Sequence, residues 1–182
     1  MVDQIRYLLS DLRRRHCASF KELFFIIFDQ AVWVTVLYRI SRALYLVNIP
    51  IIKSFLRLIG FFLFKFSETC LGASIPSSVN IGPGLYVENT GIIYISFKVI
   101  AGKNLSIDTG VILGSIGFGN NEVPILGDNI YIGVGAKVLG KIKIGNNVKI
   151  NANAVVINDI PDNVTVAGLP AKIIEKDSWV QE

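Results

Sequence analysis

Few residues in this 182-residue sequence have the types and spacing needed for catalysis or metal binding. His16 is the only histidine, and it follows three arginines in a segment typical of a polar helix. Cys17 and Cys70 lack the spacing of a metal site or a redox pair and give no disulfide framework. The sequence therefore predicts no metal site and a reducing, cytoplasmic environment, and because the N-terminal stretch lacks the pattern of a signal peptide, export is not expected.

Any further chemistry must be positioned by a repeat that begins near Ile75. From there on, an aliphatic residue followed by a small or polar one recurs every six residues, with a second apolar position two residues earlier. An amphipathic helix does not keep a period of six, so the pattern predicts a β-solenoid, a left-handed parallel β-helix in which three hexapeptides form one triangular coil. The cleanest inward-facing series are Leu126, Ile132, Val138, Ile144, Ile150 and Val156, and Ile130, Ala136, Ile142, Val148 and Ala154.

The repeat is interrupted twice. The spacing grows to eight between Val87 and Ile95 and to thirteen between Leu113 and Leu126. Extra residues in a solenoid must leave the coil as loops, and loops on a rigid scaffold are where functional residues concentrate. These two insertions are the predicted location of the site.

A helical region is expected before the repeat, over residues 1–72, with residues 73–182 as the β-helix domain. The N-terminal part is rich in Leu, Ile and Phe and has no glycine between Met1 and Gly60. Three helices are expected: near Asp3 to Arg15, from about Ser19 to Leu46, and onward from Pro50.

This N-terminal region is also the basic part of the chain. Before residue 72 basic residues outnumber acidic ones two to one, whereas the remainder is close to neutral. Such a surface meets anionic lipid or phosphate, or is a solvated helix face. Charges interrupt each apolar stretch before it reaches the roughly 20 residues of a transmembrane span. The helices are expected to pack in an oligomer, to contact the inner face of a membrane peripherally, or both, and no nucleic-acid motif accompanies the charge.

Four stretches of the repeat carry a wider pattern: IGPGLYVENTG at 81–91, GVILG at 110–114, IGVGAKVLG at 132–140 and VAGLPAKII at 166–174. Through them the chain resembles the serine acetyltransferase branch of the hexapeptide acyltransferases, including its relatives in capsule and colanic-acid clusters. The resemblance implies a homotrimer that binds acetyl-CoA in the groove between adjacent coils. It further implies that Lys172 meets a CoA phosphate as a point charge. The implied lining positions are Gly114, Gly133, Ala136, Ala154, Gly168, Pro170 and Lys172.

On the acceptor side the sequence departs from the family. The family's catalytic histidine follows an acid, and the ungapped match places Glu88 on the acid and Asn89 on the histidine. A second family histidine matches Val123, and Glu122 stands where the family has an arginine that helps to bind serine. A histidine base is therefore missing, and Asn89 cannot replace it because an amide does not titrate.

Three interpretations of this loss remain open. In the first, Glu88 is the general base in a partly apolar groove, Asn89 orients the acceptor, and Asp108 is a second acid nearby. In the second, the acceptor is an amino sugar, whose amine loses its proton without an enzymic base. In the third, the chain binds CoA without catalysing transfer.

The acceptor is expected to be a sugar of a surface polysaccharide or glycolipid precursor, O-acetylated by this protein. Serine acetyltransferases usually carry a long, mostly polar helical N-terminal region, whereas the region here is short, apolar and basic. A lipid-linked or nucleotide-linked sugar at the membrane face suits that surface better than free serine does.

Overall fold

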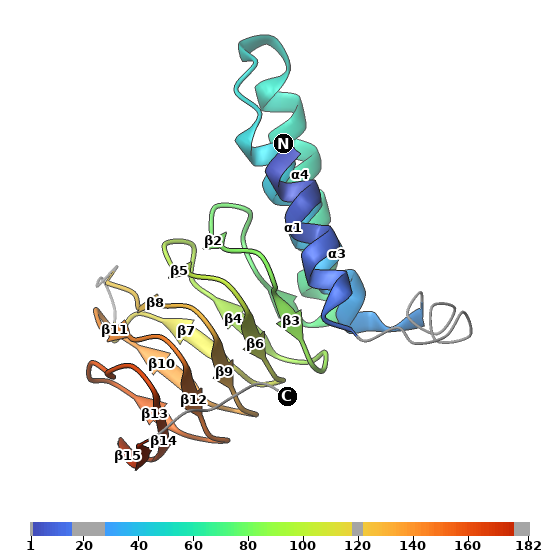
Figure 1. Ribbon diagram of the computed structural model, residues 1–182. Helices are drawn as coiled ribbons and strands as arrows, with labels where there is room; N and C mark the ends of the chain where they lie inside the picture. Colours follow the sequence, from blue (N-terminus) through green and yellow to red (C-terminus); the bar gives the residue numbers. More distant parts are fainter. Residues whose placement is uncertain (1, 16–27, 118–121, 177–182) are drawn as a thin grey trace.

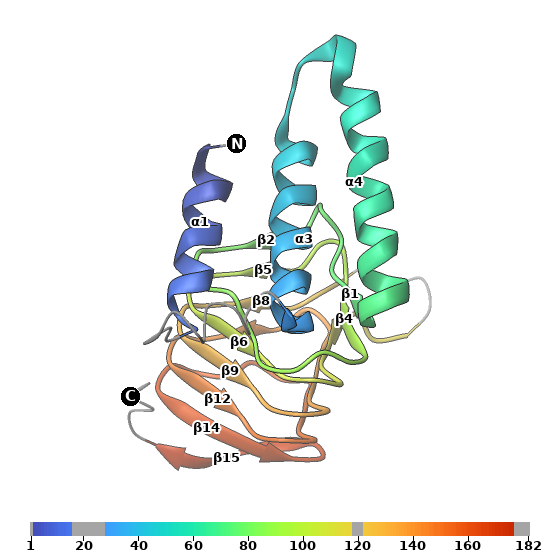
Figure 2. The same cartoon turned by 90° about the vertical axis from the view of Figure 1, so that its right-hand side faces the viewer.

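The computed structural model describes residues 2–15, 28–117 and 122–176. A triangular β-helix forms the larger part, and helices stand side by side on its N-terminal end (Figures 1 and 2). The helices of the described chain are α1 (Val2–Arg13), α3 (Gln30–Leu46) and α4 (Pro50–Leu71). The strands are β1 (Ala73–Ser74), β2 (Asn80–Ile81), β3 (Tyr86–Val87), β4 (Ile93–Ile95), β5 (Ile100–Ala101), β6 (Leu105–Ile107), β7 (Ile112–Gly114), β8 (Ile125–Leu126), β9 (Ile130–Ile132), β10 (Lys137–Leu139), β11 (Lys143–Ile144), β12 (Val148–Ile150), β13 (Val155–Val156), β14 (Val164–Gly168) and β15 (Ala171–Lys176).

Within the described chain these strands form one sheet on each face of the prism. Sheet A has the order β1-β4-β7-β10-β13, sheet B has β11-β8-β5-β2, and sheet C has β15-β14-β12-β9-β6-β3. Neighbours within a sheet are parallel and one coil apart, except that β14 and β15 form an antiparallel hairpin at the C-terminal end. The predicted left-handed parallel β-helix with an N-terminal helical region is confirmed.

The interior of the prism contains the residues that the six-residue period selected. Every member of the two inward series is buried, with at most 7% of its surface exposed. Equivalent residues stack from coil to coil, as Ile107, Ile132, Ile150 and Val166 do in sheet C. Because equivalent residues stack in this way, the residues that directly follow neighbouring strands also lie beside one another at each corner.

An asparagine ladder holds the corner between sheets B and C. Asn104, Asn129, Asn147 and Asn163 adopt positive φ angles of 56°, 57°, 55° and 59°, a conformation that asparagine tolerates better than most residues. The side-chain amide of each of the first three donates to the side-chain oxygen of the next asparagine, at 2.8, 2.8 and 2.7 Å. The ladder keeps successive coils in register.

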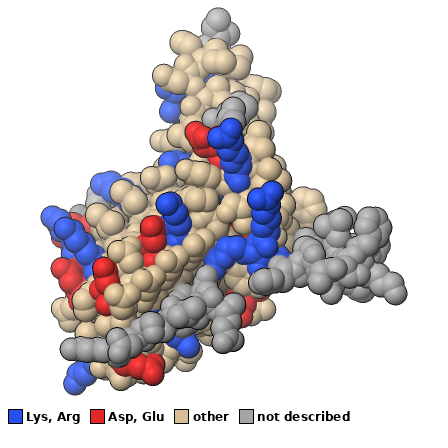
Figure 3. Space-filling view, viewed as in Figure 1, with Lys and Arg blue, Asp and Glu red and all other residues tan. Residues whose placement is uncertain are grey.

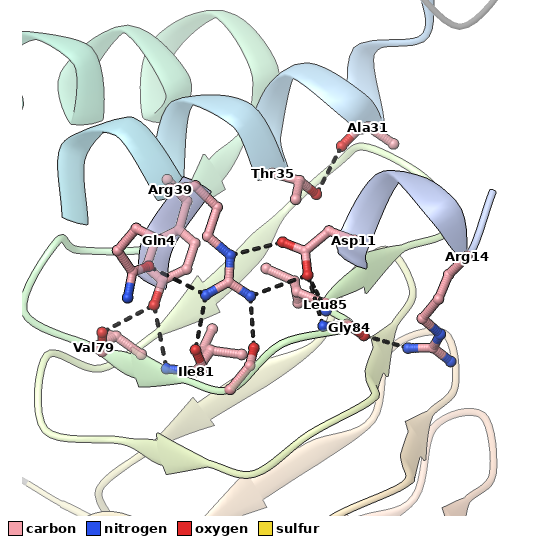
Figure 4. A network of polar contacts seen from close by, with 12 residues as sticks. Gln4, Asp11, Arg14, Ala31, Thr35, Arg39, Val79, Ile81, Gly84 and Leu85 are labelled. Carbon is pink, nitrogen blue, oxygen red and sulfur yellow. Dashed lines mark hydrogen bonds and ion pairs between the residues drawn. The ribbon is translucent and has the colours of Figure 1, made fainter. Parts of the chain in front are cut away.

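Side chains of the helices form hydrogen bonds with backbone groups of the first coil, which has no preceding coil to pair with (Figure 4). Arg39 of α3 donates to the carbonyl oxygens of Ile81 and Gly82, at 2.8 and 2.6 Å. Its guanidinium pairs with Asp11 of α1, with 2.7 Å between Nε and Oδ2. Asp11 also accepts two backbone N–H bonds of the first coil, at 2.7 and 2.8 Å. Both charged residues are almost fully buried, so the pair and its backbone partners join the helices to the coil.

The expected helix from about Ser19 to Leu46 is not continuous. In the structure α3 begins at Gln30, because the Asp29 carboxylate accepts a bond of 2.8 Å from the Ala31 N–H and caps the helix there. The expected start near Ser19 lies outside the described residues and stays a prediction. His16 and Cys17 lie outside the described residues.

Candidate active site

The corner between sheets C and A gathers residues of different coils. Glu88, Asp108 and Gly133 directly follow β3, β6 and β9, which are parallel neighbours. Backbone N–H groups of Glu88 and Asp108 donate to Ile107 and Ile132 at 2.9 and 3.1 Å. Strands in one sheet lie about 4.8 Å apart, so residues that follow them stack along the corner. The two predicted acids therefore lie on adjacent coils.

Asn89 and Asp108 contact each other directly. The Asn89 side-chain N–H donates to Asp108 Oδ1 at 3.1 Å, and the same oxygen accepts the Thr109 backbone N–H at 2.7 Å. Asp108 is 5% exposed, whereas Glu88 and Asn89 are exposed to solvent. Asp108 is thus a fixed acceptor that orients the Asn89 amide, and Glu88 is the carboxylate that a substrate can reach.

A glycine lets the first insertion approach the next coil. Gly91 has a φ of +149°, and a Cβ there would lie 2.1 Å from Thr109 Oγ1. A larger residue would push the insertion away from the coil that carries Asp108. The position of Asn89 beside Asp108 therefore depends on this glycine.

Tyr131 belongs to the same cluster and was missed by the sequence analysis. It lies in β9 in register with Ser106 of β6, on the outer face of sheet C. Burial, then the negative charges of Glu88 and Asp108, and a hydrogen bond with Glu88 raise the pKa of its phenol. The hydroxyl is therefore a proton donor toward Glu88 at neutral pH. Outward-facing positions follow no hydrophobic period, so only the coil-to-coil register brings Tyr131 to this corner.

The residues predicted to line the CoA groove lie in three places. Gly133, Ala136 and Ala154 are at the corner between sheets C and A, and Gly133 is stacked with Glu88 and Asp108. Gly114 ends β7 at the opposite edge of sheet A; Gly168, Pro170 and Lys172 belong to the terminal hairpin, where Lys172 is exposed. Ala136 and Ala154 are fully buried, and their backbone N–H and carbonyl groups bond within the coils, so in one chain they line the interior of the β-helix and not a surface groove.

The second insertion lies at the other edge of sheet A. It follows β7, and Glu122 within it pairs with Lys141 across 3.1 Å on an exposed surface. Because the first insertion follows β3 and leads into sheet A from the opposite side, a single chain keeps the two insertions apart. A shallow groove of the described chain lies elsewhere, over Ile125, Lys143 and Asp159 on the side of sheet B.

The chain is similar to serine acetyltransferases in sequence and in fold. It is 34% identical over 140 residues to the serine acetyltransferase of Synechococcus elongatus, an alignment that covers 76% of this chain and 54% of the relative. The chain spans about half the length of the curated relatives it matches. No family model matches the sequence.

Two solved structures extend this similarity to almost the whole chain. The serine acetyltransferase of Brucella abortus in complex with coenzyme A superposes with a TM-score of 0.80 and 27% identity, over 95% of this chain and 67% of that one. The Neisseria gonorrhoeae serine acetyltransferase in complex with serine gives a TM-score of 0.80 and 28% identity, over 96% and 70%.

Proposed function

We propose that this chain is an acetyl-CoA-dependent acetyltransferase that acts on a small hydroxyl acceptor. The observation that carries the proposal is the exposed Glu88 carboxylate beside the oriented Asn89–Asp108 pair, at the corner where an insertion leaves the coil. Support comes from the similarity to serine acetyltransferases, one of them in complex with coenzyme A.

In the proposed reaction Glu88 removes the hydroxyl proton of the acceptor. The acceptor oxygen attacks the thioester carbon, the new C–O bond forms, the C–S bond breaks, and the proton passes to the departing CoA sulfur. A positioned general base contributes roughly 10²–10⁴-fold to such a step. Asn89, whose N–H is fixed by Asp108, presents its carbonyl oxygen to the acceptor, and Tyr131 holds Glu88 through its hydroxyl.

The cation of the proposed acetyl-CoA site is Lys172, which is exposed on the terminal hairpin, where its charge suits a phosphate. Gly133 stacks with Glu88 but is buried, and its N–H and carbonyl oxygen bond to Ile150 and Ala136. Gly114 lies across sheet A from Glu88, so a second copy of the chain is needed to place both beside one ligand. This requirement supports the homotrimer expected from the sequence.

Serine is the first acceptor to test, because it is named by the relatives. The predicted polysaccharide sugar has no support among those names. One observation nevertheless favours a neutral sugar hydroxyl as the second candidate: Glu122 stands at the position that the sequence match assigns to a serine-binding arginine, and its carboxylate is paired with Lys141. Position 122 therefore offers no guanidinium to the carboxylate of free serine.

The test measures CoA release from acetyl-CoA by the full chain with serine, neutral sugars and amino sugars. Release that depends on a hydroxyl acceptor is the expected result, and the better acceptor decides between serine and sugar. Activity restricted to amines would assign N-acetylation without a base. Acetyl-CoA binding without acceptor-dependent release would replace the enzyme by a binding protein.

A further inference from the structure

The strand that leads to Glu88 lies at the edge of its sheet. In the described chain β3 is the last strand of sheet C, so its backbone pairs with β6 on one side and meets no earlier coil on the other. The N–H of the peptide between Val87 and Glu88 donates to the Ile107 carbonyl oxygen of the next coil at 2.9 Å. The carbonyl oxygen of this trans peptide points the opposite way, toward the open edge.

Arg15, two residues beyond the end of α1, bonds to that carbonyl oxygen. Its Nη2 donates to the Val87 oxygen, and its Nη1 pairs with Asp29 Oδ2. The guanidinium carbon also lies 5.1 Å from the centre of the Tyr86 ring, a distance at which a cation is attracted to the ring face. The side chain is 10% exposed, so three contacts hold it at the edge of β3.

Asp29 connects this arginine to the beginning of α3. Its Oδ1 accepts the Ala31 N–H at 2.8 Å and caps the helix, while its Oδ2 pairs with Arg15. One carboxylate therefore sets both the start of α3 and the direction of the guanidinium.

The helical region also bonds to the chain beyond Glu88 and Asn89. The Thr90 hydroxyl donates to the side-chain oxygen of Gln30, in the first turn of α3, at 3.1 Å. The residues before and after the Glu88–Asn89 pair are thus both bonded to the helical region, Val87 through Arg15 and Thr90 through Gln30.

The neighbouring Arg14 contacts the same strand. It donates to the Gly84 carbonyl oxygen, as Figure 4 shows, and to Ser106 Oγ at 3.0 Å. Its guanidinium carbon is 5.8 Å from the centre of the Tyr86 ring. On the face shown in Figure 3, basic side chains gather where α1 meets the first coil. The basic end of α1 therefore packs on sheet C beside the candidate site.

We propose that Arg15 is a positioning residue for Glu88, an inference that rests on the proposed acetyl transfer. It bonds to β3 where an earlier coil would otherwise do so, and it fixes the peptide that carries Glu88. Misplacing a reacting group by about 1 Å can lower a rate about 10²-fold. Loss of Arg15 should therefore lower kcat more than it changes the KM for acetyl-CoA.

The variant Arg15→Met keeps the length of the side chain and removes both hydrogen bonds. It should still fold, because the Asp29 side chain is 38% exposed and its charge stays hydrated. Its kcat for acetyl transfer should fall roughly 10-fold or more, with the KM for acetyl-CoA within about twofold. Arg15→Lys keeps a cationic donor and should recover part of the loss. The matched control Arg13→Met removes an exposed arginine of the same stretch and should leave both constants within about twofold.

Amide hydrogen exchange tests the same contact without a reaction. Arg15→Met should exchange faster at residues 86–91, while the coils from β9 onward exchange as in the original protein. Unchanged exchange at residues 86–91, or a kcat within about twofold of the original enzyme, would overturn the positioning role. If the original protein releases no CoA with any acceptor, the proposed acetyl transfer fails, and the exchange measurement alone decides whether Arg15 fixes the Glu88 peptide.

Discussion

At the scale of single residues, the proposed chemistry rests on one exposed carboxylate and its immediate neighbours. Glu88 is reachable by an acceptor, whereas Asp108 is buried and committed to Thr109 and Asn89. The two acids thus have different roles although both follow strands of sheet C. Substitutions can separate these roles.

Replacing Glu88 by glutamine keeps the size of the side chain and removes the base. Glu88→Gln should lower kcat for acetyl transfer about 10²–10⁴-fold, while the affinity for acetyl-CoA changes little. Glu175→Gln, an exposed carboxylate of β15, is the matched control and should leave kcat within about twofold. Steady-state kinetics with isothermal titration of acetyl-CoA measures both quantities. A Glu88→Gln enzyme of normal kcat would exclude Glu88 as the base.

A histidine at position 89 would stand beside a buried carboxylate. Asp108 already accepts a bond from the Asn89 amide at 3.1 Å, so it can accept the N–H of an imidazole and orient its other nitrogen as a base. Asn89→His should therefore raise kcat for hydroxyl acceptors by about 10-fold or more. In an Asp108→Asn background the gain should largely disappear. An equal gain in both backgrounds would show that Asp108 does not orient the new side chain.

At the scale of elements, the contact between the helices and the first coil depends on a buried ion pair. Asp11 of α1 and Arg39 of α3 are 2 and 1% exposed, and both bond to backbone groups of the first coil. Buried pairs add little over apolar packing, but removing one partner leaves an uncompensated charge. The pair is therefore a sensitive point for the whole helical region.

Asp11→Asn should destabilise the protein by about 3–5 kcal/mol, because the Arg39 guanidinium stays buried without its carboxylate. Urea unfolding followed by circular dichroism measures the change. Asp3→Asn alters an exposed acid of the same helix and should stay within about 0.5 kcal/mol of the original. The double variant Asp11→Asn/Arg39→Met should recover part of the loss. A change below about 1 kcal/mol in Asp11→Asn would contradict the importance of the pair.

At the scale of the whole molecule, the two insertions need more than one chain to meet. Sheet A separates the corner of Glu88 from the corner of Gly114. Exposed apolar residues occur at both corners, including Ile92 and Val134 at the first and Phe97 and Ile116 at the second. Association of copies through these corners would cover them and complete the proposed groove.

Light scattering of the full chain at micromolar concentration, in detergent-free buffer, should therefore give about three times the chain mass of 20.0 kDa. A stable monomer with full acetyltransferase activity would show that one chain contains the complete site.

The fold could be predicted from the sequence because it repeats a local rule. Each coil buries the same two positions per hexapeptide, so the period of six identified the inward residues and the insertions identified the loops. The break before α3 was not predicted, because the whole stretch favours helix whereas a single Asp29 cap begins a new helix at Gln30. Helical periodicity averages over many residues and does not register one capping side chain.

The candidate site could be predicted only in part. The sequence by itself selected Glu88, Asn89 and Asp108. The register in which the coils stack then decided that Asp108 is buried against Asn89 and that Tyr131 contacts Glu88. Those pairings join residues about 20 to 40 positions apart, which no local pattern encodes. The same holds for the buried Asp11–Arg39 pair. Hydrophobic period determines which way a residue faces within its own coil or helix, but its neighbours are decided by how coils stack and helices pack.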